Sequence, residues 1–194
     1  MRGHLHRLRS AYRRHGLAAL RIGLGRVFPP LAPEDRIDIY ARPLTSRQGG
    51  LNDWTIVRVD DPLDPFLKTL QSDFNCPAPI RKADCRKECY VVLAESAIVG
   101  YAWTTTEEFL IEEIGYTYSI APEEFFIFDC LVREDHRGRG IYPTLLVAVM
   151  NDQRQRHPWL KTALIGVSSV NLSSRRGIVK AGFSLRSSIT RETY

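Results

Sequence analysis

Residues 131–146 read LVREDHRGRGIYPTLL, and this stretch decides more about the chain than any other. Its pattern predicts an apolar strand that enters a turn with two glycines, Gly138 and Gly140, and continues directly into a helix. The backbone N–H groups of such a turn and of the helix N-terminus converge on one point, and Arg137 and Arg139 add positive charge. The stretch therefore predicts a cradle for a pyrophosphate. An ordinary connector between a strand and a helix is the alternative, and the Walker and GxGxxG patterns are both absent.

A second informative segment, residues 171–183, reads NLSSRRGIVKAGF. It predicts a helix that Asn171 caps and that Gly182 ends. Between the two segments, the spacing of apolar residues predicts a helix over 141–156 and a short buried strand over 162–167. The predicted order is therefore strand, helix, strand, helix, which is typical of a mixed α/β sheet with crossover helices.

These two segments resemble the motifs of the GCN5-related N-acetyltransferases, the GNAT superfamily. The run of residues 137–142 is similar to the acyl-CoA signature [QR]-x-x-G-x-[GA], and the second segment is similar to N-x-x-[SA]-x-x-x-Y-x-K-x-G-F. The positions of the second motif that match are Asn171, Ser174, Lys180, Gly182 and Phe183. The resemblance covers roughly residues 54–190.

The resemblance implies a mixed, largely antiparallel central sheet with crossover helices and one splayed pair of strands. The pantetheine arm of CoA would lie in the gap between the strand that ends at 131–132 and the strand 162–167, and an amide near Leu131 would face the thioester oxygen. Asn171 and Ser174 would hold the far side of the arm, and N-capping of the helix is their alternative role. The implied acyl-CoA-binding residues are Leu131, Val132, Arg137, Gly138, Arg139, Gly140, Ile141, Tyr142, Asn171 and Ser174.

The implied activity is an acyl-CoA-dependent N-acyltransferase, with acetyl-CoA or another acyl-CoA as co-substrate and no metal. Acetyl would pass to an amine of a small molecule, such as an amino sugar, by direct attack in a ternary complex. Tyrosines and a tryptophan between 101 and 118 are candidates to line an acceptor pocket, with core packing as the alternative. A run of glutamates between 107 and 124 would favour a cationic amine if it bordered the cleft, and a solvated loop is the alternative.

The sequence departs from the family pattern at the residues that move protons. Tyr142 stands where a small residue is expected, and Ile178 replaces a tyrosine that many members use as general acid. The loss of this tyrosine has two explanations. Another group donates the proton, with Tyr142 or a water as candidates, or the protein is a non-catalytic acyl-CoA-binding module. Asp129, which interrupts the apolar run FFIFDCLV, and Glu124 are the candidate general bases, because Gly166 occupies the place of a frequent family glutamate.

Residues 1–33 are set apart from this domain, which we expect to span 34–194. Seven arginines and no acid lie in 1–28, whereas the rest of the chain carries 20 basic and 22 acidic residues. The apolar spacing there predicts two short amphipathic helices, followed by a proline-rich linker. They would pack on the domain, bind an anionic membrane surface, act as a transit peptide or, least favoured, grip nucleic acid. If they bind a membrane surface, the acceptor of the acyl group could be lipid-like.

No apolar stretch is long enough for a membrane span, so we expect a cytoplasmic protein, with peripheral membrane attachment as an option. Four cysteines without paired CxxC spacing indicate reduced thiols and no zinc site.

The chain ends soon after its last predicted strand, so the family's seventh strand is either missing or supplied from elsewhere. An exposed sheet edge there would favour a homodimer. The remaining predicted elements are strands 36–42, 55–59, 90–94, 98–104, 125–132 and 184–190, a helix after Asp64 and a short helix over 80–87.

Overall fold

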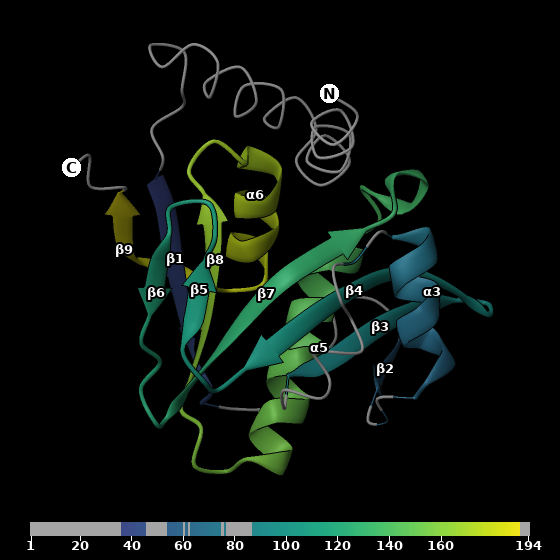
Figure 1. Ribbon diagram of the computed structural model, residues 1–194, viewed down its shortest axis with the longest axis horizontal. Coiled ribbons are helices and arrows are strands. Elements are labelled where there is room, and N and C mark those ends of the chain that lie inside the picture. Colours follow the sequence, from purple (N-terminus) through teal and green to yellow (C-terminus); the bar gives the residue numbers. More distant parts are fainter. Residues whose placement is uncertain are drawn as a thin grey trace.

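The structure is a computed structural model that describes residues 36–45, 54–59, 61, 63–74, 76 and 87–190 (Figure 1). The predicted helices of the terminal segment, the domain boundary at 33/34 and nearly all of the predicted helix 80–87 lie outside these residues. The strands are β1 Arg36–Pro43, β2 Thr55–Val59, β3 Glu88–Ala94, β4 Ala97–Thr105, β5 Phe109–Ile111, β6 Tyr116–Tyr118, β7 Glu124–Val132, β8 Thr162–Ser168 and β9 Ser184–Thr190. The helices are α3 Pro65–Asp73, α5 Ile141–Arg156 and α6 Leu172–Lys180, with a 3₁₀ turn, η2, at Glu134–His136.

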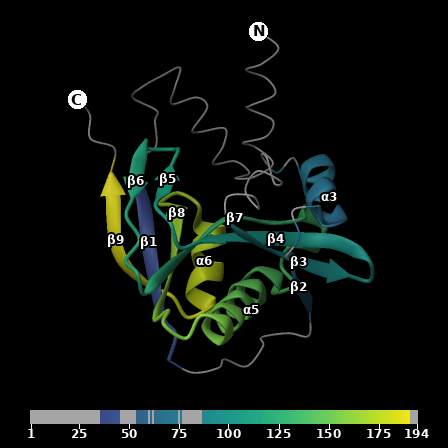
Figure 2. The same ribbon diagram turned by 60° about the horizontal axis from the view of Figure 1, so that its bottom comes forward.

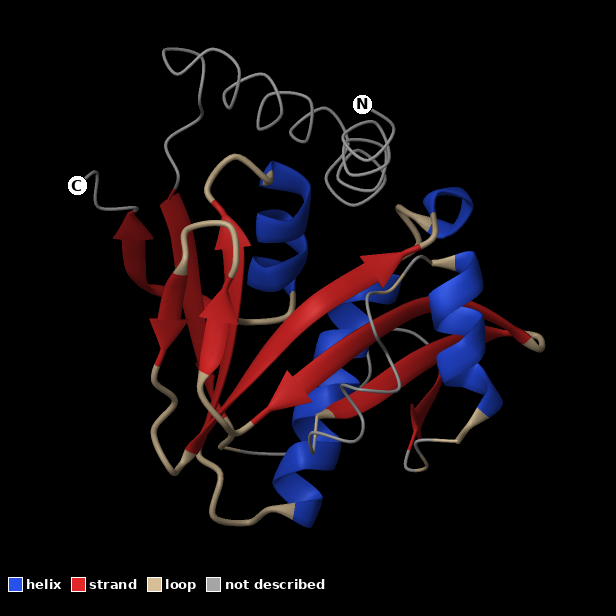
Figure 3. Cartoon of the chain, viewed as in Figure 1, coloured by secondary structure: helices blue, strands red, loops and turns tan. Residues whose placement is uncertain are grey.

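The central sheet has seven strands in the order β2-β3-β4-β7-β8-β1-β9. Figure 3 shows the strands in red and the helices in blue. All its neighbours pair antiparallel except β7 and β8, which are parallel and are joined through α5. A parallel pair requires a crossover connection of this kind. The predicted mixed, largely antiparallel α/β sheet with crossover helices is confirmed.

The parallel pair β7–β8 is splayed, as expected. Its register begins at Glu124 opposite Thr162 and ends at Ile127 opposite Ile165, although β7 continues to Val132. Beyond that point β7 stays paired with β4, and β8 stays paired with β1. Figure 1 shows β7 leaning away from β8 toward β4. On the side of each strand that faces the resulting gap, the backbone beyond Ile127 and Ile165 therefore has no neighbouring strand among the described residues.

Strand β1 fills a place in the sheet that its position in the chain does not suggest. It lies between β8 and β9, and Ile37 stands opposite both Ser168 of β8 and Ile189 of β9. The strand that we expected to be missing or supplied from elsewhere is thus supplied by a segment that precedes the family-like region. Among the described strands, β9 is left at one edge of the sheet and β2 at the other.

Apolar side chains form one core cluster on each face of the sheet, and Figure 2 shows the helices that lie against it. Helices α5 and α6 pack on one face with the side chains of Leu145, Val149 and Ile178. Helix α3 and the β5–β6 hairpin pack on the other face, where the ring of Phe109 stacks on Phe126 with centroids 5.0 Å apart. We call these the helix face and the hairpin face. The hairpin was not predicted.

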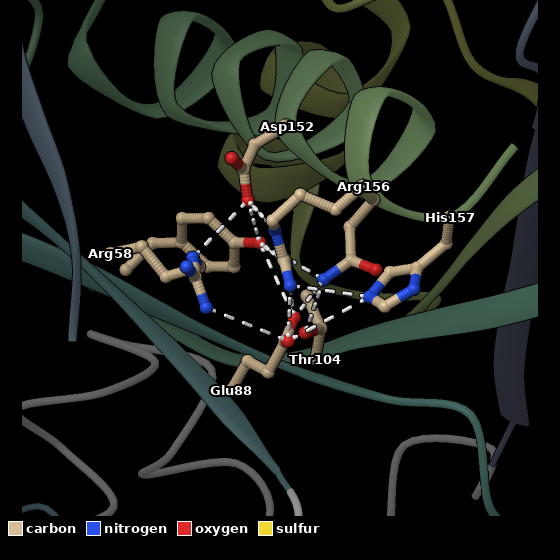
Figure 4. Close-up of polar contacts among 8 residues, drawn as sticks. Arg58, Glu88, Thr104, Asp152, Arg156 and His157 are labelled. Atoms are coloured by element: carbon tan, nitrogen blue, oxygen red, sulfur yellow. Dashed lines mark hydrogen bonds and ion pairs between the residues drawn. The ribbon is translucent and has the colours of Figure 1, made fainter. Parts of the chain in front are cut away.

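A polar network fixes the C-terminal half of α5 to the sheet (Figure 4). The Arg156 guanidinium makes two ion-pair contacts with Glu88 of β3, at 2.6 and 2.7 Å, and its Nε lies 2.8 Å from Asp152. The Tyr90 hydroxyl donates to Asp152 at 2.7 Å. Burial acts to raise the pKa of Glu88, but hydrogen bonds from Arg156 and Gln153 and the charges of Arg156 and Arg58 outweigh it and lower the pKa overall. Helix α5 is thereby held in one register against β3.

Within the described part of the chain, no helix is long and apolar enough to cross a membrane.

Candidate active site

The predicted anion cradle forms a left-handed turn at the N-terminus of α5. Gly138 and Gly140 have φ of +79° and +77°, a region that favours glycine. Gly140 is the N-cap of α5 and brings no side-chain cap, and Pro143 in the first turn has no N–H. The first helical bond there runs from the Thr144 amide to the Gly140 carbonyl. The amides of Ile141 and Tyr142 therefore precede the helical ladder, and they suit an external anion.

Side chains around the cradle tie the loop to the end of β7. Arg137 Nε donates to the Val132 carbonyl at 3.2 Å, and its Nη1 lies 3.5 Å from Glu134. Hydrogen bonds from His136 and Arg133 lower the pKa of Asp135 to about 2. The guanidinium of Arg137 thus braces the loop, while the phosphate-binding role predicted for it and for exposed Arg139 stays a prediction.

Peptide groups alternate along the end of β7, and the hydrogen bonds show which ones face the gap. The Arg133 amide donates to Val99 of β4 at 2.9 Å. The backbone N–H and C=O groups of successive residues in a strand point to opposite sides. Those of Leu131 therefore also face β4, and those of Val132 face the gap. The Val132 carbonyl accepts a hydrogen bond from Arg137, which agrees with a carbonyl that does not face β4. The structure therefore places Val132, and not Leu131, as a donor toward the gap.

Asn171 performs the N-cap role that we gave as its alternative. Its side-chain oxygen accepts from the Ser174 amide at 3.1 Å and from the Ser173 hydroxyl at 3.0 Å. The Asn171 side-chain nitrogen makes no hydrogen bond within the described residues. At the other end of α6, Gly182 has φ +83°, and bonds from its own amide and that of Phe183 close the helix as predicted. Contact of Asn171 and Ser174 with a ligand stays a prediction.

Asp129 lies in a β-bulge at the point where β7 leaves β8. Trp103 stands opposite Phe128 and Tyr101 opposite Leu131, so two residues of β7 share a single partner in β4. Asp129 has φ +44°, which is uncommon for a residue other than glycine. Its carboxylate accepts from the Tyr101 hydroxyl at 3.3 Å and lies 3.7 Å from the buried Cys76 thiol. The bulge thus directs the acid toward the hairpin face, across the sheet from α5 and α6.

Glu124, the second candidate base, is not brought to the same place. It opens β7 opposite Thr162, at the paired end of β7–β8, and lies 2.5 Å from Arg186 of β9. Five residues of strand, about 16 Å, separate it from Asp129. A Cβ at Gly166 would lie 3.1 Å from the Phe126 ring, so the family's glutamate could stand there only if that ring shifted.

The aromatic residues that we expected to line an acceptor pocket lie partly in the core and partly on the surface. Tyr101 and Trp103 are fully buried, and Tyr118 packs on Phe126 with ring centroids 5.5 Å apart, so these three serve core packing. Tyr116 stays exposed on the hairpin. Cys76, Cys89 and Cys130 form no disulfide with one another, and no group of three metal-binding side chains gathers within the described ranges.

Solved structures with this fold include acetyltransferases of low sequence identity. An acetyltransferase of the GNAT family from Novosphingobium aromaticivorans is 16% identical with a TM-score of 0.54, and the match covers 79% of this chain and 61% of that one. A GCN5-related N-acetyltransferase from Sphaerobacter thermophilus is 16% identical with a TM-score of 0.55, over 86% and 54% of the two chains. The aminoglycoside N-acetyltransferase AAC(6')-Iy, solved with CoA, is 15% identical with a TM-score of 0.50, over 72% and 96%.

The chain spans about three fifths of the length of the first of these structures. No curated protein sequence matches it significantly. The model of the acetyltransferase (GNAT) family, however, matches residues 54–183, which is most of the chain and includes both sequence motifs. The chain therefore belongs to the GNAT acetyltransferase family.

Proposed function

We propose that the protein binds acetyl-CoA at the splayed end of β7–β8 and transfers the acetyl group to an amine. The observation that carries this proposal is the end of strand pairing at Ile127 and Ile165, beside an uncapped, glycine-formed helix N-terminus. The pyrophosphate fits the cradle because the amides of Ile141 and Tyr142 precede the helical ladder. The pantetheine arm fits the gap, where the Val132 amide can pair with it as a neighbouring strand would.

The two faces of the sheet would then supply different parts of the reaction. Acetyl-CoA supplies an activated thioester, and the Val132 amide and the donors of α5 and α6 would hold the arm and the pyrophosphate of its CoA part from the helix face. Asp129, on the hairpin face, would attract the ammonium group of the acceptor and take its proton as nitrogen attacks. One C–N bond forms and one C–S bond breaks, and the electron pair of the broken bond stays on sulfur.

The proposed acceptor is a small amine, with amino sugars included. The negative charge of Asp129 favours a cationic acceptor over a neutral alcohol. The structural neighbour named as an aminoglycoside N-acetyltransferase is a further reason to test aminoglycosides. The panel should also hold simple amino sugars, polyamines, amino acids and a lipid-like amine.

The test is thiol release from acetyl-CoA by the full chain with each member of this panel. We expect release above the acceptor-free rate with at least one amine, and a product whose mass shows one added acetyl group. If the protein binds CoA but releases no thiol with any acceptor, it is a non-catalytic acyl-CoA-binding module and the proposal of transfer is wrong.

A further inference from the structure

Acidic residues are distributed unevenly along the chain. Residues 162–190, which include β8, α6 and β9, contain four basic residues and no acid. Residues 1–33 contain seven arginines and no acid, whereas the rest of the chain holds 16 basic and 22 acidic residues. The protein is therefore cationic in two stretches that lie far apart in the sequence, and anionic elsewhere.

Strand β1 joins the two acid-free stretches. It begins at Arg36 and pairs with β8 on one side and with β9 on the other. The Arg36 carbonyl accepts from the Ser169 amide at 3.0 Å, just before α6. Figure 1 shows β1, β8 and α6 next to one another. Asp38, the acid of β1, is buried and lies 3.7 Å from Arg175 of α6. The arginines of residues 1–33 are therefore attached to the part of the fold that itself carries positive charge.

Helix α6 exposes apolar and basic side chains along one side. Leu172 and Val179 are two helical turns apart, so they point to the same side, and they are 60% and 56% exposed. Arg176 lies one turn after Leu172 and Lys180 follows Val179, and both are exposed. Ile178, at the position of the family's tyrosine, points away from them and is fully buried in the core of the helix face. Helix α6 thus keeps two large apolar side chains in water beside two positive charges.

We propose that this side of α6 binds an anionic lipid surface, with Leu172 and Val179 entering the interface and Arg176 and Lys180 near the lipid phosphates. Positive charge alone would equally suit a nucleic acid, but exposed apolar side chains beside it are typical of a segment that lies in a membrane interface. The arginines and the apolar spacing of residues 1–28 meet the same requirement. The inference does not depend on acetyl transfer, because none of these four α6 residues belongs to the proposed CoA site.

The test is co-sedimentation of the full chain with vesicles of phosphatidylcholine alone and with vesicles of equal parts phosphatidylcholine and phosphatidylglycerol. Binding is compared for the wild type, for a double variant Arg176→Gln with Lys180→Gln, and for a double variant Leu172→Ser with Val179→Ser. We expect the wild type to prefer the anionic vesicles and added salt to weaken its binding. Each double variant should bind the anionic vesicles about tenfold more weakly, because it loses either two charges or two inserted side chains. A Tm close to that of the wild type shows that a variant is folded.

The matched control is the double variant Leu63→Ser with Trp159→Ser, which removes two other exposed apolar side chains from outside both acid-free stretches. It should bind the anionic vesicles as the wild type does, and a loss equal to that of the α6 variants would overturn the assignment to α6. Wild-type binding by both α6 variants would leave the lipid surface to residues 1–28 and overturn it too. No preference of the wild type for anionic vesicles, or tighter binding to a double-stranded DNA oligonucleotide, would overturn a lipid partner altogether.

Discussion

Asp129 illustrates what a single residue contributes to this fold. A left-handed conformation in a residue other than glycine costs about 1–3 kcal/mol and persists only where the surroundings enforce it. Here β4 enforces it on one side through the bulge, and the Tyr101 hydroxyl holds the carboxylate. Without the bulge, alternation would direct Asp129 to the helix face, among the apolar residues of α5. The strain therefore carries the acid to the face opposite the CoA-binding groups.

Asp129→Asn tests whether this acid is the base. Asparagine tolerates the left-handed conformation, so we expect the fold and the Kd for CoA to persist. The amide cannot take a proton, and kcat should fall by about 10²- to 10⁴-fold. Steady-state kinetics with the best acceptor, beside CoA titration, measures both. If Asp129→Asn keeps its kcat while Glu124→Gln loses it, the base is Glu124 and the assignment to Asp129 is wrong.

The sequence made Asp129 conspicuous because an acid interrupts an apolar run. It did not reveal the bulge, because the extra residue of β7 is defined only by the pairing with β4. For the same reason the choice between Leu131 and Val132 at the gap depends on which peptide groups β4 already uses. The glycines of the cradle were predictable, since their role follows from local backbone conformation alone.

At the scale of elements, the C-terminal half of α5 depends on an ion pair that acid should weaken. The pKa of Glu88 is lower in the folded state than the ordinary value of about 4.3, so the unfolded state binds more protons as pH falls. Its contribution is complete above that value and is lost as pH falls through the folded pKa. Removing its charge should cost about 1–2 kcal/mol near neutral pH, between the values for exposed and buried pairs.

Denaturant unfolding of the wild type and Glu88→Gln near pH 7 and near pH 3 measures this contribution. We expect the wild type to be the more stable near pH 7 and the difference between the two proteins to shrink near pH 3. A difference that stays constant between the two pH values would show that the ion pair with Arg156 does not hold α5.

The contact between α5 and α6 gives a second prediction at this scale. Gly177→Ala should destabilise the protein by about 1–3 kcal/mol, because its Cβ meets the Tyr142 ring. In a Tyr142→Ala background the same change should be neutral or stabilising, because alanine is a better helix former than glycine. A double-mutant cycle of unfolding free energies measures the coupling. Additive effects of the two substitutions would contradict the contact.

Most elements were predictable because their signals are local. Asp64 accepts from the Phe66 amide at 2.8 Å and begins α3 as an N-cap, and α5 spans the residues that the apolar spacing indicated. The β5–β6 hairpin was missed because its strands are three residues long and are surrounded by glutamates. Its signal was the alternation of Phe109 with Ile111 and of Tyr116 with Tyr118 on either side of Gly115.

At the scale of the whole molecule, β1 connects the family-like domain to the segment before it. Its inner side chains support α6: buried Asp38 lies 3.7 Å from Arg175, the Tyr40 hydroxyl accepts from Arg175 at 3.1 Å, and Arg42 donates to the Ala181 carbonyl. The alternating pattern of β1 predicted a strand. It could not predict which strands flank it, because pairing partners are set by the assembled sheet.

Hydrogen exchange of the unliganded protein tests this central placement of β1. We expect the amides of Ile37 to Ala41 to exchange as slowly as those of Ala163 to Ile165 in β8, because both strands are paired on two sides in the same core. Exchange of β1 at the rate of an edge strand such as β9 would show that it is attached loosely and does not hold α6.

The central claim is that acetyl-CoA binds at the splayed end of the sheet, and the same exchange measurement with acetyl-CoA tests it most directly. We expect slower exchange at residues 132–142 and 171–174, and no change around Arg58 and Glu88 at the far end of α5. Protection confined to other elements, or no protection at acetyl-CoA concentrations that saturate binding, would contradict the account.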